Sequence, residues 1–192
     1  MRNAECERTE GRRFETLDRL LKSRTILIAG EVDEEMAERV LGQLLILDAE
    51  SQDPIRVVIS SNGGHVESGL AIHDTMRFVR SDIVALGAGW VVSIAVPIFF
   101  GAPKESRYSL PNTRFMIHQP LGGVGGQAAD LSIAAREIIK IRERLNRMIS
   151  EETGQPIEKV TKDTDRNYWL DSKEALDYGI VSKIVQSIDE IA

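Results

Sequence analysis

Apolar residues alternate along the chain between short continuous runs and longer stretches with helical spacing. The continuous runs predict buried strands, and they are TILIAG (25–30), IRVVIS (55–60) and DIVALGAG (82–89). Between them, apolar residues recur every three or four positions, which predicts one helix capped by Asp33 and another over about 67–79. This alternation of strand and helix predicts an α/β domain with largely parallel strands.

The second half of the chain continues the pattern with one much longer helix. The sequence RFMIH (114–118) predicts a short strand, and an amphipathic helix is expected over about 128–152. An apolar stripe runs along that helix, formed by Leu131, Ala135, Ile138, Ile141, Leu145 and Ile149. Asp171 with Glu174 predicts a helix capping box, and IVSKIV (180–185) predicts a closing strand.

Two stretches have surroundings that suit reactive groups. The apolar run WVVSIAVPIFF (90–100) is far shorter than the ~20 residues that span a bilayer, so it predicts a buried helix entered by a tight turn. Ser93 would lie in the first turn of this helix, where free N–H groups and the positive end of the helix dipole favour negative charge. Earlier, SSNGG (60–64) ends in two glycines, which permit positive φ or close backbone approach.

Length and charge narrow the class of protein. The chain has 192 residues, which suits one compact domain. Its net charge is −6 and it has no basic run, so neither nucleic acid nor an anionic membrane is an expected partner.

The cysteine and histidine content argues against disulfides and metals. The single cysteine, Cys6, cannot form an internal disulfide, and no signal-peptide pattern precedes it, so a cytoplasmic protein is expected. One cysteine and three scattered histidines do not predict a metal site. Ordinary roles are expected for His65, in a solvated turn, and for His73, hydrogen-bonded on a helix. No cofactor is predicted, and without a G-x-x-x-x-G-K loop any ATP must be used by a partner.

Four segments of the chain closely resemble the ClpP family, the proteolytic subunits of the Clp protease. They are ISSNGGHVESGLAIHDTM (59–76), VVSIA (91–95), SRYSLPNTRFMIHQPLGGVGGQAADLSIAAREI (106–138) and DTDRNYWLDSKEALDYGIV (163–181). The resemblance runs without an apparent gap from about Leu20 to Val185. It implies a ClpP/crotonase-like head built from repeated β-β-α units, with a projecting handle helix.

The resemblance also implies how the single domain, 1–192, is divided. A polar tail is expected over 1–13, a head over about 14–120 and 154–192, and a handle over about 121–153. The tail lacks the apolar anchors with which the family meets its unfoldase, so direct engagement of an unfoldase is in question.

The resemblance assigns the catalytic roles residue by residue. Ser93 matches the family nucleophile and His118 its general base, while Asn167 stands at the position of the residue that orients the histidine. The main-chain N–H groups of Gly64 and Ile94 match the donors of the oxyanion hole. Together these groups are what hydrolysis of an amide bond requires.

Asn167 is the main departure from the family pattern, which typically reads DTDRD where this chain reads DTDRN. An asparagine can accept a hydrogen bond from the histidine, but it cannot neutralise the imidazolium that forms during attack. Asp163, Asp165 and Asp171 are carboxylates that could stand in for the missing one. In the family, the residues that match Asp165 and Arg166 pair across the interface between two rings.

The expected assembly is a heptameric ring stacked in pairs as a tetradecamer around a closed chamber. The implied partners are an AAA+ unfoldase of the Clp family, unfolded proteins or short peptides as substrates, and, as a further option, a second ClpP paralogue. One hypothesis is a weakly active serine endopeptidase of an ATP-dependent protease. Its alternative is a catalytically weak structural or regulatory ring subunit. A thioester-binding crotonase is a third reading, which the MIHQP string (116–120) and the Ser–His order disfavour.

Overall fold

The computed structural model describes residues 16–121 and 127–191, and it confirms the α/β class. In chain order the elements are β1 (Thr25–Val32), α2 (Glu34–Glu50), β2 (Ile55–Gly64), α3 (Val66–Phe78), β3 (Ile83–Val92), α4 (Ala95–Phe99), a 3₁₀ helix (Lys104–Ser106), β4 (Arg107–Ser109), β5 (Arg114–Ile117), α5 (Ala128–Thr153), α6 (Ile157–Asp163), β6 (Tyr168–Leu170), α7 (Ser172–Tyr178), β7 (Lys183–Ile184) and a second 3₁₀ helix (Ile188–Glu190). The predicted tail over 1–13, with Cys6, and the glycines of 122–126 lie outside the described residues.

One seven-stranded sheet organises the described part of the chain. The strands β1, β2, β3, β4 and β7 are neighbours in that order and are parallel. Strand β5 adds to β3 in parallel, and β6 adds to β5 in the antiparallel direction. The prediction of largely parallel strands is confirmed, and the antiparallel β5–β6 pair is what brings a late segment of the chain back beside an earlier strand.

On the edge that faces away from β2, strand β3 pairs with two different strands. Residues 85–87 pair with β4, whereas 90–92 pair with β5. Gly89 lies between the two ladders with a φ of +68°, which glycine adopts without strain. The prediction of a helix over 90–100 was therefore wrong at its start, because its first three residues continue the strand and only 95–99 are helical. A tryptophan and two valines favour a strand wherever a neighbouring strand is available to pair with them.

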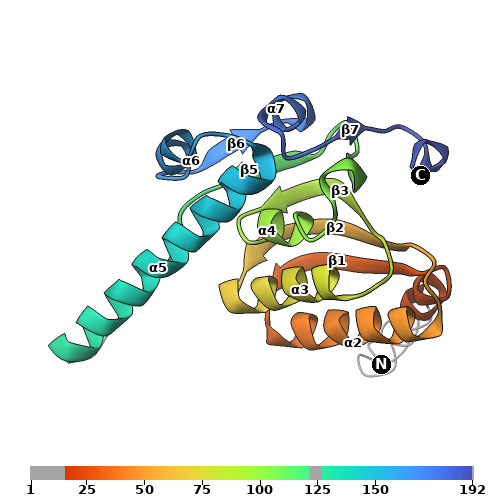
Figure 1. Ribbon diagram of the computed structural model, residues 1–192, viewed down its shortest axis with the longest axis horizontal. Coiled ribbons are helices and arrows are strands. Elements are labelled where there is room, and N and C mark those ends of the chain that lie inside the picture. The colour runs from red at the N-terminus through yellow and green to blue at the C-terminus, as the bar shows by residue number, and fades with distance from the viewer. Residues whose placement is uncertain (1–15, 122–126, 192) are drawn as a thin grey trace, which may run out of the picture.

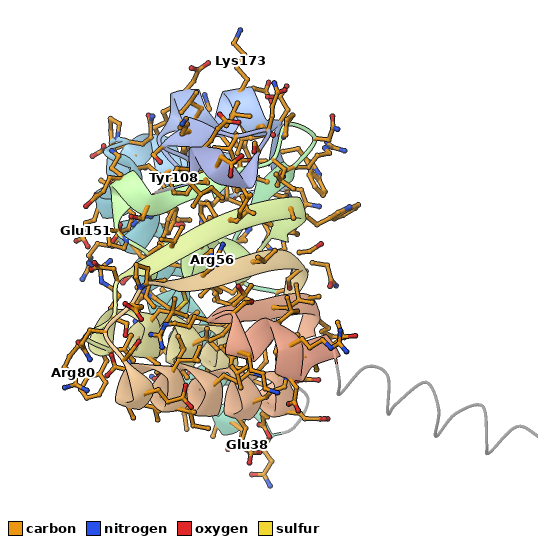
Figure 2. All side chains as sticks on the ribbon, turned by 90° about the vertical axis from the view of Figure 1, so that its right-hand side faces the viewer. Glu38, Arg56, Arg80, Tyr108, Glu151 and Lys173 are labelled. Atoms are coloured by element: carbon orange, nitrogen blue, oxygen red, sulfur yellow. The ribbon has the colours of Figure 1, made fainter. Side chains whose placement is uncertain are left out.

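Helices α2 and α3 lie side by side against the sheet (Figure 1). The predicted cap of α2 is confirmed, since the Asp33 carboxylate accepts a hydrogen bond of 2.7 Å from the Met36 N–H. In the view turned by 90°, Glu38 lies on the outer side of α2, and Lys173 points away from α7 at the opposite end of the molecule (Figure 2).

Helix α5 leaves the body of the protein over most of its length (Figure 1). Near its end Leu145 and Ile149 are buried in the core, but nearer its start Leu131 and Ile133 are exposed. The apolar stripe predicted for this helix therefore packs on the body only at its C-terminal end. Gly154 then ends the helix in a left-handed conformation.

The prediction for His73 was wrong in one respect. The ring is buried on α3, but neither of its nitrogens has a hydrogen-bond partner among the residues that the structure describes. Burial is the main cause that lowers the pKa of His73, and the nearby Arg77 and Arg107 lower this pKa further. The acidic Asp74 and Glu152 raise the pKa, but each by less than burial lowers it. His73 is therefore buried in its neutral form.

We expect the stability of the protein to fall as the pH is lowered below 6.5, the ordinary pKa of histidine. In that range the unfolded chain binds a proton at His73 that the folded chain does not, so stability is lost by at most about 1.4 kcal/mol per pH unit. The variant His73→Phe should retain its stability at neutral pH and lose part of this pH dependence. Urea unfolding at fixed protein concentration, at neutral and mildly acidic pH, measures both, and an unchanged pH slope in the variant would contradict the prediction.

Candidate active site

The register of three strands brings the predicted catalytic residues together. Ser93 directly follows β3, whose last residues pair with β5, and its own N–H donates to the Met116 carbonyl of β5 over 2.8 Å. His118 directly follows β5. Because β6 is antiparallel to β5 and Tyr168 is opposite Ile117, Asn167 lies beside His118.

Two hydrogen bonds connect the three side chains in a line. His118 Nε2 is 2.8 Å from Ser93 Oγ, and His118 Nδ1 is 3.0 Å from Asn167 Oδ1. An amide oxygen only accepts hydrogen bonds, so this contact requires Nδ1 to carry the ring hydrogen. Nε2 then has a free lone pair facing the Ser93 hydroxyl, as a general base requires.

Ser93 occupies a strained turn between β3 and α4. Its φ is +58°, a left-handed conformation that costs a non-glycine residue on the order of 1 kcal/mol or more. The expectation that Ser93 lies in the first turn of a helix over 90–100 was wrong. The serine precedes a helix of only five residues, so the helix dipole acts more weakly on it than the sequence suggested.

The glycine pair at the end of β2, Gly63 and Gly64, fits closely against its neighbours. A Cβ at Gly63 would lie 2.6 Å from Ser93 Cβ, so a glycine is needed there for the serine to keep its position. At Gly64, where φ is +151°, a Cβ would lie 2.2 Å from the Val32 carbonyl oxygen. Sequence reasoning expected positive φ in this pair, which is confirmed, but it singled out Gly64 and missed the contact between Gly63 and the nucleophile.

A narrow apolar cleft opens at the nucleophile. It has a volume of about 20 Å³ and is lined by Val66, Ser93, Ile94, Pro97, Ile117, His118, Pro120, Leu145 and Ile149. Ile94 is one of the lining residues, and α5 contributes to the wall through its packed end. In the described ranges no group of three or more histidine, cysteine, aspartate or glutamate side chains could hold a metal ion.

A family model for Clp protease matches residues 7–188. The chain belongs to the Clp protease family. Its function is accordingly that of a serine endopeptidase, the proteolytic subunit of a Clp protease, as the sequence predicts. The match spans nearly the whole chain, so the crotonase reading is set aside.

Relatives of this Clp protease subunit cover most of its length. "ATP-dependent Clp protease proteolytic subunit 3" of Rhizobium meliloti is 55% identical over 177 residues, which are 92% of this chain and 91% of the relative. The solved structure of ClpP1 from Listeria monocytogenes is 50% identical, with a TM-score of 0.83 over 91% of this chain and 98% of its own. An asparagine-to-aspartate mutant of that ClpP1 has a TM-score of 0.86 at 48% identity, over 92% and 99% of the two chains. The predicted ClpP-like fold is confirmed.

Asp163, one possible substitute for the missing catalytic carboxylate, is engaged elsewhere. Its Oδ2 is 2.5 Å from Lys159 Nζ and accepts a hydrogen bond of 2.9 Å from the Tyr178 hydroxyl. Burial and this contact with Asp163 raise the pKa of Tyr178, so the phenol stays protonated as the donor. In this Clp protease subunit, Asp163 therefore belongs to a local structural cluster with Lys159 and Tyr178.

The other two carboxylates also have partners of their own. Asp171 caps α7 in the predicted capping box with Glu174, which is confirmed. Asp165, expected at a contact between rings, lies 3.6 Å from Arg142 on α5 of the same chain, and Arg166 is exposed. Asn167 is thus the residue that holds His118, and no described carboxylate replaces it in that contact.

The remaining predicted feature near the site is His65. Its ring is exposed, as expected for a turn, and Nδ1 lies 2.8 Å from the Ser68 hydroxyl at the start of α3.

Among the helices that the structure describes, none is long and apolar enough to cross a membrane.

Proposed function

We propose that Ser93, His118 and Asn167 form the catalytic triad with which this subunit hydrolyses peptide bonds. The observation that carries the proposal is the unbroken line of hydrogen bonds from Asn167 through His118 to Ser93. Ser93 Oγ attacks the scissile carbonyl carbon while His118 Nε2 takes its proton. His118 then gives that proton to the leaving amine, and the acyl enzyme is hydrolysed by water through the same base.

The main-chain N–H groups of Gly64 and Ile94 are proposed to stabilise the oxyanion of the tetrahedral intermediate. Ile94 follows the nucleophile within a strained turn, and Gly64 follows the glycine that packs on Ser93. A rigid turn supports this role, because donors that are fixed before the reaction need no reorganisation when charge develops. The small apolar cleft beside them favours an uncharged side chain before the cleaved bond.

Low intrinsic activity follows from Asn167. A neutral amide fixes the tautomer of His118 but offers no charge to the imidazolium that forms during attack. Asp163, Asp165 and Asp171 are held by other groups, which supports the view that no carboxylate supplies this charge from nearby.

The proposed context is a cytoplasmic, compartmentalised protease of two stacked heptameric rings. In this arrangement about 14–120 and 154–192 form the head and about 121–153 the handle, with Asp165 and Arg166 between the rings. The exposed apolar residues along the start of α5 support a partner for the handle. The Rhizobium meliloti relative is named ATP-dependent, and we assign the ATP to a Clp-type AAA+ unfoldase that delivers unfolded chains. A second ClpP paralogue is a further candidate partner.

The alternative function is a structural or regulatory ring subunit that acts beside an active paralogue. The replacement of the usual carboxylate by Asn167 is the observation that favours it. The two functions differ in whether the protein by itself can acylate its serine.

A serine-reactive fluorophosphonate probe distinguishes them. We expect the assembled wild-type protein to be labelled at Ser93 only, because His118 is already placed to take the hydroxyl proton. The variant Ser93→Ala should give no label, and dilution to the monomer should reduce it. Peptide mass spectrometry locates the label, and sedimentation measures assembly in the same samples. A lack of label at Ser93 in every assembly state would contradict the peptidase function and leave the structural one.

A further inference from the structure

The chain contains two tryptophans, and they meet on the surface beside the active site. Trp90 and Trp169 pack edge to face with ring centroids 5.6 Å apart and an angle of 88° between their planes. The Arg114 guanidinium lies over the Trp169 ring, 4.5 Å from its centroid. Trp90 is 50% exposed and Trp169 is 36% exposed, so burial alone does not explain two such large rings. We call these three residues the Trp–Arg–Trp stack.

The strand register places the whole stack on one face of the sheet. Trp90 on β3 is directly opposite Arg114 on β5, and Trp169 on β6 is directly opposite Met116 on β5. Arg114 and Met116 are two residues apart and point to the same side. The two tryptophans are therefore diagonal neighbours across β5, within reach of each other's rings.

Each member of the stack belongs to a strand that has a member of the triad directly before or after it. Trp90 is three residues before Ser93. Arg114 is four residues before His118, and Trp169 is two residues after Asn167. The stack therefore links all three catalytic strands within a few residues of the groups that must stay aligned.

The link matters because the ladders that otherwise align these strands are short. Only three residue pairs join β3 to β5, and only three join β5 to β6. Strands β3 and β6 are not neighbours in the sheet. The contact between the two tryptophan rings connects them directly and bypasses β5.

We propose that the Trp–Arg–Trp stack positions the triad by holding the ends of β3, β5 and β6 in one arrangement. The proposal rests on the proposed catalytic role of Ser93, His118 and Asn167. The three stack residues are positioning residues, since they act through the backbone of the strands. Asn167 depends on the stack most, because β6 has no other hydrogen-bonded neighbour strand than β5 in the described sheet.

The size of the effect follows from the two contacts that would be lost. An aromatic pair and an exposed cation–π contact together stabilise the aligned arrangement enough that their loss should reduce its population about tenfold. The maximal rate of Ser93 acylation should fall by the same factor, because the probe reacts only with the aligned triad. Affinity for the probe should change little, since none of the three residues lines the cleft.

The test compares Trp169→Ala with the conservative variant Trp169→Phe and the control Leu176→Ala. Leu176 is also 36% exposed, but it lies on α7 and takes no part in the stack. For each assembled protein, the saturating rate of fluorophosphonate labelling at Ser93 and the half-saturating probe concentration are measured separately. Near-UV circular dichroism reports the packing of the tryptophan pair, and sedimentation reports the assembly.

We expect Trp169→Ala to lower the saturating rate about tenfold with an unchanged half-saturating concentration, Trp169→Phe to restore most of the rate, and Leu176→Ala to match wild type. Equal rates in all variants, despite a lost dichroism band in Trp169→Ala, would overturn the positioning role of the Trp–Arg–Trp stack and leave the triad intact. A slower rate that accompanies loss of assembly would also overturn it, because the stack would then be a subunit contact. A wild-type protein that is never labelled would instead overturn the proposed function, and with it the positioning role of the Trp–Arg–Trp stack.

Discussion

Replacing Asn167 by aspartate is expected to raise the rate of peptide cleavage by up to about 10⁴-fold, because the reverse exchange at the matching residue of a serine protease lowers kcat by about that factor. The two side chains have nearly the same shape, so Oδ1 can keep its contact of 3.0 Å with His118 Nδ1. The added charge stabilises the imidazolium that forms as Ser93 attacks. The gain should therefore appear in kcat, with KM nearly unchanged.

The same exchange at Asn112 provides a matched control. Asn112 is exposed in the turn between β4 and β5 and does not line the cleft. Initial rates on a fluorogenic peptide would be measured for Asn167→Asp, Asn112→Asp and the double variant Asn167→Asp with Ser93→Ala. Only the first should gain activity, and the double variant should have none. If Asn167→Asp stays as slow as wild type in a fully assembled particle, the geometry is not catalytic and the structural function gains.

The fold was predictable where local pattern and tertiary environment agree. Asp33 and Asp171 begin helices because their carboxylates accept main-chain hydrogen bonds that no other group satisfies, and a capping residue acts within a few residues of itself. The parallel order of the strands followed in the same way from the alternation of strands and helices. Such features depend on neighbours in sequence.

Features that depend on distant parts of the chain were not predictable from the pattern. Trp90 begins an apolar run that could be helix or strand, and its pairing with Arg114, 24 positions later, decides for strand. Ser93, in its left-handed conformation, likewise has distant partners, because its N–H donates to the Met116 carbonyl and Gly63 leaves room for its Cβ.

The candidate site was identified mainly through resemblance. Composition alone could not select Ser93 and His118, because isolated serines and histidines are common in ordinary cores and turns. The structure adds the two distances that make them a chemical unit, and it adds Gly63, whose lack of a side chain leaves room for Ser93.

Replacing Glu152 by alanine is expected to lower the free energy of unfolding by about 3–5 kcal/mol, because it leaves a buried charge without a partner. Arg107 is 1% exposed and forms an ion pair with Glu152 at the end of α5. Its other hydrogen bonds go to the carbonyl oxygens of Ala102 and Phe100, which carry no charge, and its Nη1 has no hydrogen-bond partner among the described residues. Burial already lowers the pKa of Arg107, which indicates how costly the charge is at this position.

Glu151 offers the matched control for this change. It precedes Glu152 on the same helix but its side chain is exposed and points away from the body (Figure 2). Urea unfolding at one protein concentration should show a large loss of unfolding free energy for Glu152→Ala and a loss within about 0.5 kcal/mol for Glu151→Ala.

Substituting both partners of the ion pair, with Arg107→Met and Glu152→Leu, should recover much of the stability, since a well-packed apolar pair carries no desolvation penalty. A loss in the double variant as large as in Glu152→Ala would mean that the ion pair itself, and not the orphaned guanidinium, dominates. Glu152 also accepts a hydrogen bond of 2.9 Å from Arg77 at the end of α3. Glu152 therefore connects the C-terminal end of α5 to α3 and to β4. Helix α5 in turn forms part of the wall of the cleft at Ser93.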